Sequence, residues 1–382
     1  MRAREPGLGA LSVDVEAPAI HLLAELTLAL LLFADAARVN LTRLRHDIGL
    51  PARLLGIGLP LTVLLGALAA AWLFQDFTWA LAGFVGAALA PTDAALSAQV
   101  INDERIPRRV RRALNVESGL NDGIVTPIVV FMLAVAADQL DGHHADTAAV
   151  HPLLELAIGI LAGLAIGLVA AKLIASGARR GWILSGGRRL ATLAAAVGSF
   201  AVAGGLGGNG FIAAFVAGMA FGAALPRDVV DAAEVGEFPE LLGEMLSLAV
   251  WFLFGAALVP VAFEYFSVWT LVYAMLSLTA IRLVPVALGM LGTGQDRPTV
   301  LFIGWFGPRG LASVVFALLA IEELAPSAAA GQAVSVVAFT VLLSVVVHGV
   351  TAGTLGMRYA LGHRDGISPD GAAPRSRRQI HR

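Results

Sequence analysis

Residues 111–138 read RRALNVESGLNDGIVTPIVVFMLAVAAD, an apolar stretch that carries two carboxylates, Glu117 and Asp122. The stretch is long enough to cross a bilayer as a helix, which needs about 20 residues. An acidic side chain at the centre of such a helix costs roughly 2.5–3.5 kcal/mol on insertion scales, so it is usually paired or functional. At helical spacing Glu117 and Asn121 share one face, and Ser118 and Asp122 share the next. The helix therefore presents an oxygen-rich site suited to a hard cation or a proton.

The rest of the chain is as apolar as this stretch. Of its 382 residues, 58% are hydrophobic and 14% are charged, and the mean hydropathy is +0.80. These values lie outside the range of soluble globular proteins, so we expect an all-α polytopic membrane protein. The formal net charge of -2 is divided among separate loops, and no face for a nucleic-acid partner is indicated. The chain has no cysteine, which excludes a thiolate nucleophile and a cysteine metal site.

Eleven apolar runs approach the length that spans a bilayer, which predicts a helical membrane bundle of about eleven spans. The runs cover residues 17–37, 50–74, 79–100, 110–137, 152–174, 190–206, 211–225, 241–263, 268–291, 299–321 and 331–355. We expect one transmembrane domain over residues 1–361. Residues 362–382 are too polar to bury and are predicted to form a disordered, basic cytoplasmic tail without a specific partner, with contact between its arginines and anionic lipid as the alternative. No cofactor is expected for the protein.

The loop charges predict an orientation in the cell membrane. Basic side chains gather in alternate connections, within residues 38–53, 105–112 and 172–189, whereas the intervening connections carry acids and no Lys or Arg. By the positive-inside rule the N-terminus lies outside and the C-terminus lies in the cytoplasm. The loop that contains Arg227 is ambiguous because five acids surround that single arginine.

Two of the predicted spans are interrupted, one by Pro91-Thr92-Asp93 and the other by Gly307-Pro308-Arg309-Gly310. Proline removes a backbone donor, and orphan backbone groups are tolerated at membrane depth only where they are buried in protein or line a wet cavity. Two broken spans in corresponding places of two halves indicate a transporter with inverted repeats and a substrate site where they meet. We expect Asp93 at the start of its second half-helix, where it complements the helix dipole. A simple proline kink is the alternative.

Three further charged residues lie in apolar spans. Arg282, in SLTAIRLVPV, needs a carboxylate partner in hydrocarbon, and Glu117 is the natural candidate. The alternative is that Arg282 extends to the membrane surface. Glu25 and Asp35 in the first span are each compatible with a solvated or a functional position.

Other motifs indicate packing and not chemistry. Residues 205–210 match G-x-G-x-x-G but follow an apolar helical run, which favours a tight turn. Gly159, Gly163 and Gly167 recur every fourth residue and should let two helices approach closely. His348 is interpreted as a helix-packing residue. The sequence has no His-Glu zinc motif and no G-x-S-x-G nucleophile, so an enzyme is not expected.

Four motifs occur in one order along the chain: TDAA after Pro91, ESGLNDG at 117–123, the lone arginine of SLTAIRLVPV and GPRG at 307–310. Together they resemble the sodium/proton antiporter family, in the branch of the eukaryotic exchangers and their NhaP-type prokaryotic relatives. The resemblance implies a six-helix core that moves against a flatter dimerisation panel, with alternating access around a midplane site. It also implies a homodimer.

The same resemblance implies the cation site. Asp122 would bind either sodium or a proton, and Thr92 and Ser118 would supply further oxygens. Asn121 would hold Glu117. An Asn before Asp122 resembles the electroneutral branch, which exchanges one cation for one proton. A buried carboxylate can hold a proton or a desolvated cation, but holding both is unfavourable.

The remaining implied roles are structural or accessory. Glu117 would pair with Arg282 as a structural bridge. Asp93 and Arg309 would offset the half-helix dipoles at the crossing. Asp35 is the nearest candidate for an accessory acid of the family, although LLFADAARV departs from the usual acid-Gly pattern.

The expected function is therefore exchange of sodium or lithium for protons, with a role in pH homeostasis. A potassium/proton antiporter is the alternative, because oxygen ligands alone do not fix ion size, and a cation channel is a further one. Counting spans on either side of the two breaks leaves the first half two helices short. This count suggests a chain that lacks about two N-terminal family helices.

Overall fold

The computed structural model describes residues 18–38, 49–140, 150–226, 230 and 232–362. All regular structure in these ranges is helical, which confirms the predicted fold class. The predicted tail lies outside the described residues, apart from its first residue. The helical segments are α1 (Pro18–Arg38), α3 (Gly49–Arg53), η1 (Leu54–Gly58), α4 (Leu59–Leu73), α5 (Trp79–Ala88), α6 (Ala98–Ile101), α7 (Arg108–Leu140), α8 (Val150–Arg179), α9 (Ser185–Gly205), α10 (Gly210–Ala224), α11 (Ala232–Leu253), η2 (Phe254–Leu258), α12 (Val259–Glu264), α13 (Val268–Leu278), α14 (Ala280–Gly289), α15 (Arg297–Trp305), α16 (Leu311–Glu323) and α17 (Ala328–Gly362).

Each of the eleven predicted spans coincides with a helix or with helical segments that follow one another. Within the described ranges, seven stretches are long and apolar enough to cross a membrane, and α5 and α10 are shorter apolar helices. The chain is thus a multi-pass membrane protein. The main difference from prediction is at the ends: α9 begins at Ser185 and α11 at Ala232, both earlier than their apolar runs. An α-helix satisfies its own backbone hydrogen bonds, so it can continue beyond the hydrocarbon into the polar residues that flank an apolar run.

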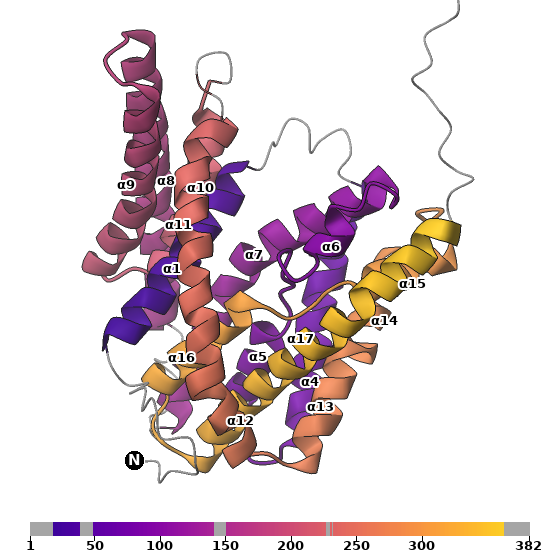
Figure 1. The fold of residues 1–382 in the computed structure, drawn as a ribbon. Helices are drawn as coiled ribbons and strands as arrows, with labels where there is room; N and C mark the ends of the chain where they lie inside the picture. Colours follow the sequence, from indigo (N-terminus) through magenta and orange to yellow (C-terminus); the bar gives the residue numbers. More distant parts are fainter. Residues whose placement is uncertain (1–17, 39–48, 141–149, 227–229, 231, 363–382) are drawn as a thin grey trace, which may run out of the picture.

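The helices form two groups that meet along α7 and α16 (Figure 1). One group contains α1, α8, α9, α10 and α11, and the other contains α4, α5, α13, α14 and α17. In the first group, α8 approaches α10 so closely that a Cβ atom on Gly163 would lie 2.4 Å from the Ala213 carbonyl oxygen, and one on Gly167 would lie 2.3 Å from that of Ala217. The predicted close approach at the glycine repeat is therefore confirmed.

Both predicted breaks are present, and the two broken segments meet. The first leaves residues 89–97 between α5 and α6, and the second leaves residues 306–310 between α15 and α16. The Asp93 amide donates to the Pro308 carbonyl at 2.9 Å, which joins the two breaks directly. The second half of the first broken span is much shorter than predicted, because α6 is a single turn.

Ion pairs between helices mark the two ends of the bundle. Arg38, at the end of α1, pairs with Glu240, and Arg189 of α9 lies 3.0 Å from Glu237. The acids at the start of α11 therefore lie at the same end as the basic connections, which resolves the ambiguous loop. At the opposite end His21 lies 3.1 Å from Glu322. The cytoplasmic assignment of the basic end stays a prediction from the loop charges.

Candidate ion site

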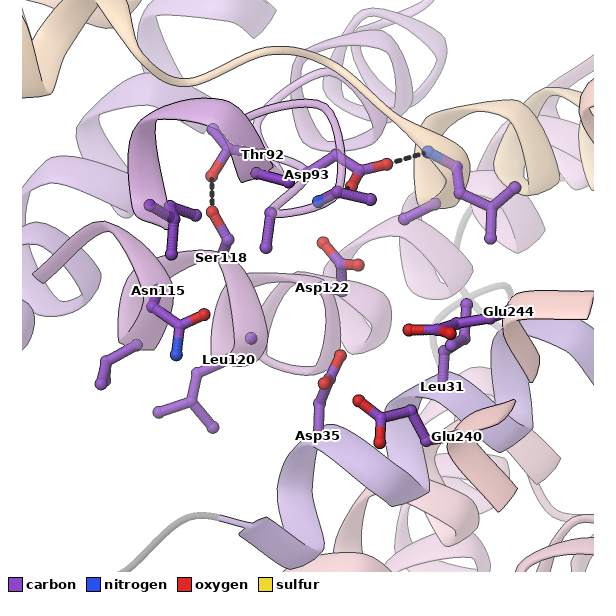
Figure 2. A pocket seen from close by; sticks show the side chains of 18 of the residues that line it. Leu31, Asp35, Thr92, Asp93, Asn115, Ser118, Leu120, Asp122, Glu240 and Glu244 are labelled. Atoms are coloured by element: carbon purple, nitrogen blue, oxygen red, sulfur yellow. Dashed lines mark hydrogen bonds between the residues drawn. The ribbon is translucent and has the colours of Figure 1, made fainter. Parts of the chain in front are cut away.

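A cavity of about 980 Å³ lies where the two helix groups face each other, beside the crossing of the breaks. Five of the residues singled out in the sequence line it: Asp35, Thr92, Asp93, Ser118 and Asp122. Figure 2 shows them converging from α1, from the α5–α6 break and from α7. The structure thus brings together residues that are up to 87 positions apart in the chain, as Asp35 and Asp122 are.

A hydroxyl pair forms one wall of the site. Thr92 Oγ1 and Ser118 Oγ are 3.0 Å apart, and Asn121 Nδ2 donates to Thr92 Oγ1 at 2.7 Å. All three side chains are buried. A hydroxyl oxygen has two lone pairs, so with Thr92 donating to Ser118 each oxygen retains one lone pair for a cation.

The implied contact between Asn121 and Glu117 is not what the structure shows. The Asn121 amide donates to Thr92, while both Glu117 oxygens accept from Arg282, at 2.5 and 2.9 Å. The reason is that a bidentate guanidinium occupies the carboxylate more strongly than a neutral amide can. Asn121 therefore orients a residue of the ion site and not the buried ion pair.

Asp122 occupies the centre of the cavity wall. Figure 2 places it between Asp93 and Asp35, with its carboxylate facing the open space. It is half-buried, and in the part of the chain that the structure describes its carboxylate has no hydrogen bond or ion pair. A carboxylate beside two hydroxyls is a donor set for a hard monovalent cation. Thr92, Ser118 and Asp122 are the residues that could hold such a cation.

Glu117 and Arg282 lie behind this wall and face away from the cavity. Their side chains are 1% and 2% exposed and form a bidentate salt bridge between α7 and α14. Two helices are thereby fixed to each other at membrane depth. Arg282 occupies both oxygens of Glu117 and neutralises its charge, so this carboxylate is not free to bind another cation.

Asp93 joins the breaks through its side chain as well. Its Oδ1 accepts from the Ala95 amide at 2.7 Å, and its Oδ2 accepts from the Leu311 amide at 3.1 Å. Leu311 is the first residue of α16, so Asp93 complements the N-terminus of the other broken helix. The expectation that it begins its own second half-helix is wrong, because α6 starts only at Ala98. The physical reason is that the α16 end presents unsatisfied amide groups directly opposite Asp93.

Arg309 binds carbonyl groups at the C-terminal end of α5, the first half of the other broken span. Its buried guanidinium donates to the carbonyls of Ala90 and Pro91 at 2.9 and 3.3 Å, just beyond the end of α5, and to Ser277 O at 3.1 Å. These carbonyls have lost their helical partners at the break, so a cation there satisfies both the hydrogen bonds and the dipole.

Sequence reasoning missed one wall of the cavity. Glu240, Glu244, Ser247 and Trp251 of α11 all line it, and Figure 2 shows both glutamates facing Asp35 across the space. Their spacing of four, three and four residues places them on one helical face. That stripe was the available signal, but α11 begins earlier than its apolar run, so Glu240 and Glu244 looked like residues of a loop and of a helix end.

The sequence pattern of the transmembrane sodium/hydrogen exchanger family matches residues 6–358, and the chain belongs to this family. The family contains secondary transporters and not enzymes.

Individual relatives are more distant. The K(+)/H(+) antiporter NhaP2 of Shewanella sp. strain ANA-3 is 25% identical over 366 residues, which are 92% of this chain and 60% of the relative. The K(+)/H(+) antiporter NhaP of Alkalimonas amylolytica is 26% identical, over 83% of this chain and 54% of its own length. The chain thus spans about 60% of the first of these relatives. Among solved structures, the sodium proton antiporter MjNhaP1 from Methanocaldococcus jannaschii at pH 8 shares the fold, with a TM-score of 0.70, 22% identity and coverage of 88% of this chain and 85% of that one.

Proposed function

We propose that the protein exchanges a monovalent cation for a proton across the membrane, with both ions competing for Asp122. One observation carries this proposal: Asp122 lies on a cavity wall without a partner among the described residues, beside the hydroxyls of Thr92 and Ser118. Such a carboxylate is neutralised either by a proton or by a cation that the hydroxyls help to coordinate. Exchange follows if only the neutralised site can cross between the two sides.

We further propose that the exchange is electroneutral. The residue before Asp122 is Asn121, whose amide is engaged with Thr92 and carries no charge. A site with one exchangeable carboxylate moves one cation against one proton. Asn121→Asp tests the stoichiometry, since a second ionisable group in this position is expected to make exchange depend on the membrane potential or to lower its rate.

Sodium or lithium is the proposed cation, and potassium is the second candidate. The relatives named above as potassium/proton antiporters favour potassium, whereas the structural neighbour is a sodium proton antiporter. The donor set does not decide between them, because two hydroxyls and a carboxylate suit any of these ions.

The deciding experiment uses proteoliposomes with an acidic interior and a pH-sensitive dye. Sodium, lithium, potassium and choline are added in turn, with the membrane potential either free or clamped. We expect sodium and lithium to dissipate the pH gradient to the same extent in both conditions, and choline to do nothing. A response to potassium alone supports the second candidate. Cation flux without proton counterflow overturns exchange and indicates a channel.

The proposed arrangement in the membrane follows the loop charges, with the basic end of the bundle in the cytoplasm. The cavity is lined by Arg38, Arg108 and Arg112 as well as by the acids, so it extends to that end. We therefore propose that the structure represents an inward-open form. A homodimer is proposed from the family resemblance alone. Labelling of single cysteines introduced at Arg180 and Trp79 tests the orientation in a chain that has none of its own.

A further inference from the structure

One face of α17 lies against the second break. Ser344, His348 and Thr351 are spaced by four and three residues, so they form a stripe on this face. Each of them contacts the segment 305–309: Ser344 at the Arg309 backbone, His348 at the Trp305 carbonyl and Thr351 at the Trp305 indole. Ser344 and His348 are almost fully buried, and the contact between Ser344 and the Arg309 backbone is enclosed by protein.

The donors and acceptors of this stripe can be assigned. The Arg309 amide donates to Ser344 Oγ at 2.8 Å, and His348 Nε2 lies 2.9 Å from the Trp305 carbonyl oxygen. A carbonyl oxygen only accepts, so Nε2 carries a hydrogen. His348 Nδ1 is 3.2 Å from Ser344 Oγ and 2.9 Å from the Ser344 carbonyl. A neutral ring accepts from the hydroxyl, and a doubly protonated ring donates to the carbonyl. In both forms the bond from Nε2 to Trp305 stays.

The two backbone groups held in this way lie at the edges of the break. Trp305 is the last residue of α15, and Arg309 is two residues before α16 begins. The buried Arg309 amide donates to Ser344, and a buried donor without a partner would be costly. The Trp305 carbonyl accepts from the Gly307 amide at 2.8 Å and has its second lone pair directed to His348. Ser344 and His348 thus bind both edges of the break from one helix and hold them at a fixed separation.

The opposite side of the same segment contacts Thr92 and Asp93, which line the ion site. The Pro308 carbonyl accepts from the Asp93 amide at 2.9 Å, and the residue before Asp93 is Thr92, which contacts Ser118. A Cβ atom on Gly307 would lie 2.9 Å from Thr92 Cγ2, so the segment also touches Thr92 directly. A shift of the segment toward or away from α17 therefore moves a hydroxyl of the ion site.

We propose that Ser344 and His348 are positioning residues for the cation: they clamp the segment Trp305–Arg309 against α17 and thereby hold Thr92 in its place. This inference rests on the proposed function. Neither residue lines the cavity. Loss of the clamp should weaken cation binding while the chain still folds and moves.

The test compares two buried serines of α17. Ser344→Ala removes the hydrogen bond to the Arg309 amide. Ser335→Ala removes a hydrogen bond of 2.8 Å to the carbonyl of Ala262, a residue that does not belong to the broken segment 306–310. For Ser344→Ala we expect the cation concentration at half-maximal exchange to rise roughly fivefold, as befits one lost hydrogen bond, with an unchanged maximal rate per folded protein. Ser335→Ala should leave both values unchanged. Ser344→Thr should restore the wild-type concentration.

His348 gives a second pair of variants. His348→Gln keeps an N–H donor for the Trp305 carbonyl, whereas His348→Leu removes it. The leucine variant should show the larger rise in half-maximal cation concentration. A rise of equal size in Ser335→Ala and Ser344→Ala, or a loss confined to the maximal rate, overturns the positioning role.

A measurement without transport keeps the two proposals apart. Amide hydrogen exchange in detergent should become faster over residues 305–311 in Ser344→Ala and not in Ser335→Ala. If the wild type moves no protons with any cation, the proposed function fails, and the clamp stands or falls by this measurement. If the wild type exchanges ions and hydrogen exchange of the segment is unchanged in Ser344→Ala, the clamp is wrong and the function stands.

Discussion

Glu117 and Asp122 are carboxylates on the same helix, yet their surroundings differ completely. Glu117 is 1% exposed, and both of its oxygens accept from Arg282. Asp122 is half-buried, lines the cavity and has no partner among the described residues. Five residues in a helix of 3.6 residues per turn correspond to a rotation of about 140°, so one helix can serve both environments.

The difference separates two ways of neutralising a charge in a membrane. A guanidinium that belongs to the protein neutralises Glu117, so this carboxylate needs no ion from outside the chain. Asp122 has to be neutralised by a group from outside the chain, and that requirement makes it suitable for exchange. The variants below change one member of this comparison at a time.

The largest expected effect is that of Asp122→Asn. Removing the exchangeable charge should abolish cation-driven proton movement in proteoliposomes. Because the Asp122 carboxylate makes no hydrogen bond within the described residues, the yield of monodisperse protein in detergent should equal that of the wild type. Exchange at the wild-type level in this variant contradicts the proposed mechanism.

Neutralising the fixed pair should give the opposite pattern. Glu117→Gln or Arg282→Gln leaves one buried charge unpaired, at a cost of roughly 3–5 kcal/mol in stability. Thermal unfolding in detergent should show the loss, and the protein that remains folded should keep its cation selectivity. In the double variant Glu117→Gln with Arg282→Gln, part of the stability should return. Simply additive losses would mean that the two residues do not act as a pair.

A smaller effect is expected at the crossing of the breaks. A Cβ atom on Gly310 would lie 2.1 Å from Asp93 Cβ and Oδ2, so Gly310→Ala must displace the side chain that caps α16. Overpacking of this kind costs about 1–3 kcal/mol. Gly349→Ala on α17 is the matched control, because nothing lies within 4 Å of the added methyl group. Equal thermal stability of the two variants would contradict the close approach of the breaks.

The sequence predicts those features that are costly within a single membrane span, whatever its neighbours are. A proline or a charge inside an apolar run is costly wherever the rest of the chain lies, so the breaks at Pro91 and Pro308 and the buried charges of Glu117 and Arg282 are visible without a structure. The spans are predicted for the same reason, since bilayer thickness fixes their length.

The pairing of Glu117 with Arg282 and the meeting of the two breaks were predicted correctly, but other features that depend on three-dimensional neighbours were not. Asn121 could bond to Glu117 on its own helix or to Thr92 in the first break. Arg282 donates to both Glu117 oxygens, and Asn121 donates to Thr92. Asp93 caps α16, more than 200 residues away in the chain. Glu244 was overlooked because an acid near the start of an apolar run can lie at a helix end or on a cavity wall, and the local sequence does not distinguish the two positions.

The smallest effect is expected from a pair that resembles the buried one in geometry but lies outside the membrane-spanning segments. Asp103 accepts from Arg105 through both carboxylate oxygens, at 2.8 Å each, while the Arg105 side chain is 53% exposed. The hydrogen bond from Arg105 lowers the pKa of Asp103. Because the pKa of Asp103 is lower in the folded than in the unfolded protein, its charge stabilises the folded state above the unfolded pKa of about 3.9, and this stabilisation is lost as the pH falls through the folded pKa.

Water and salt screen such a pair, so Asp103→Asn should leave exchange and thermal stability at pH 7 unchanged within error. Any small loss of stability should shrink in high salt, decrease as the pH falls below about 4, and vanish below the lowered pKa of Asp103 in the folded protein. A loss as large as that of Glu117→Gln would show that geometry, and not burial, determines the cost of breaking a salt bridge in this protein.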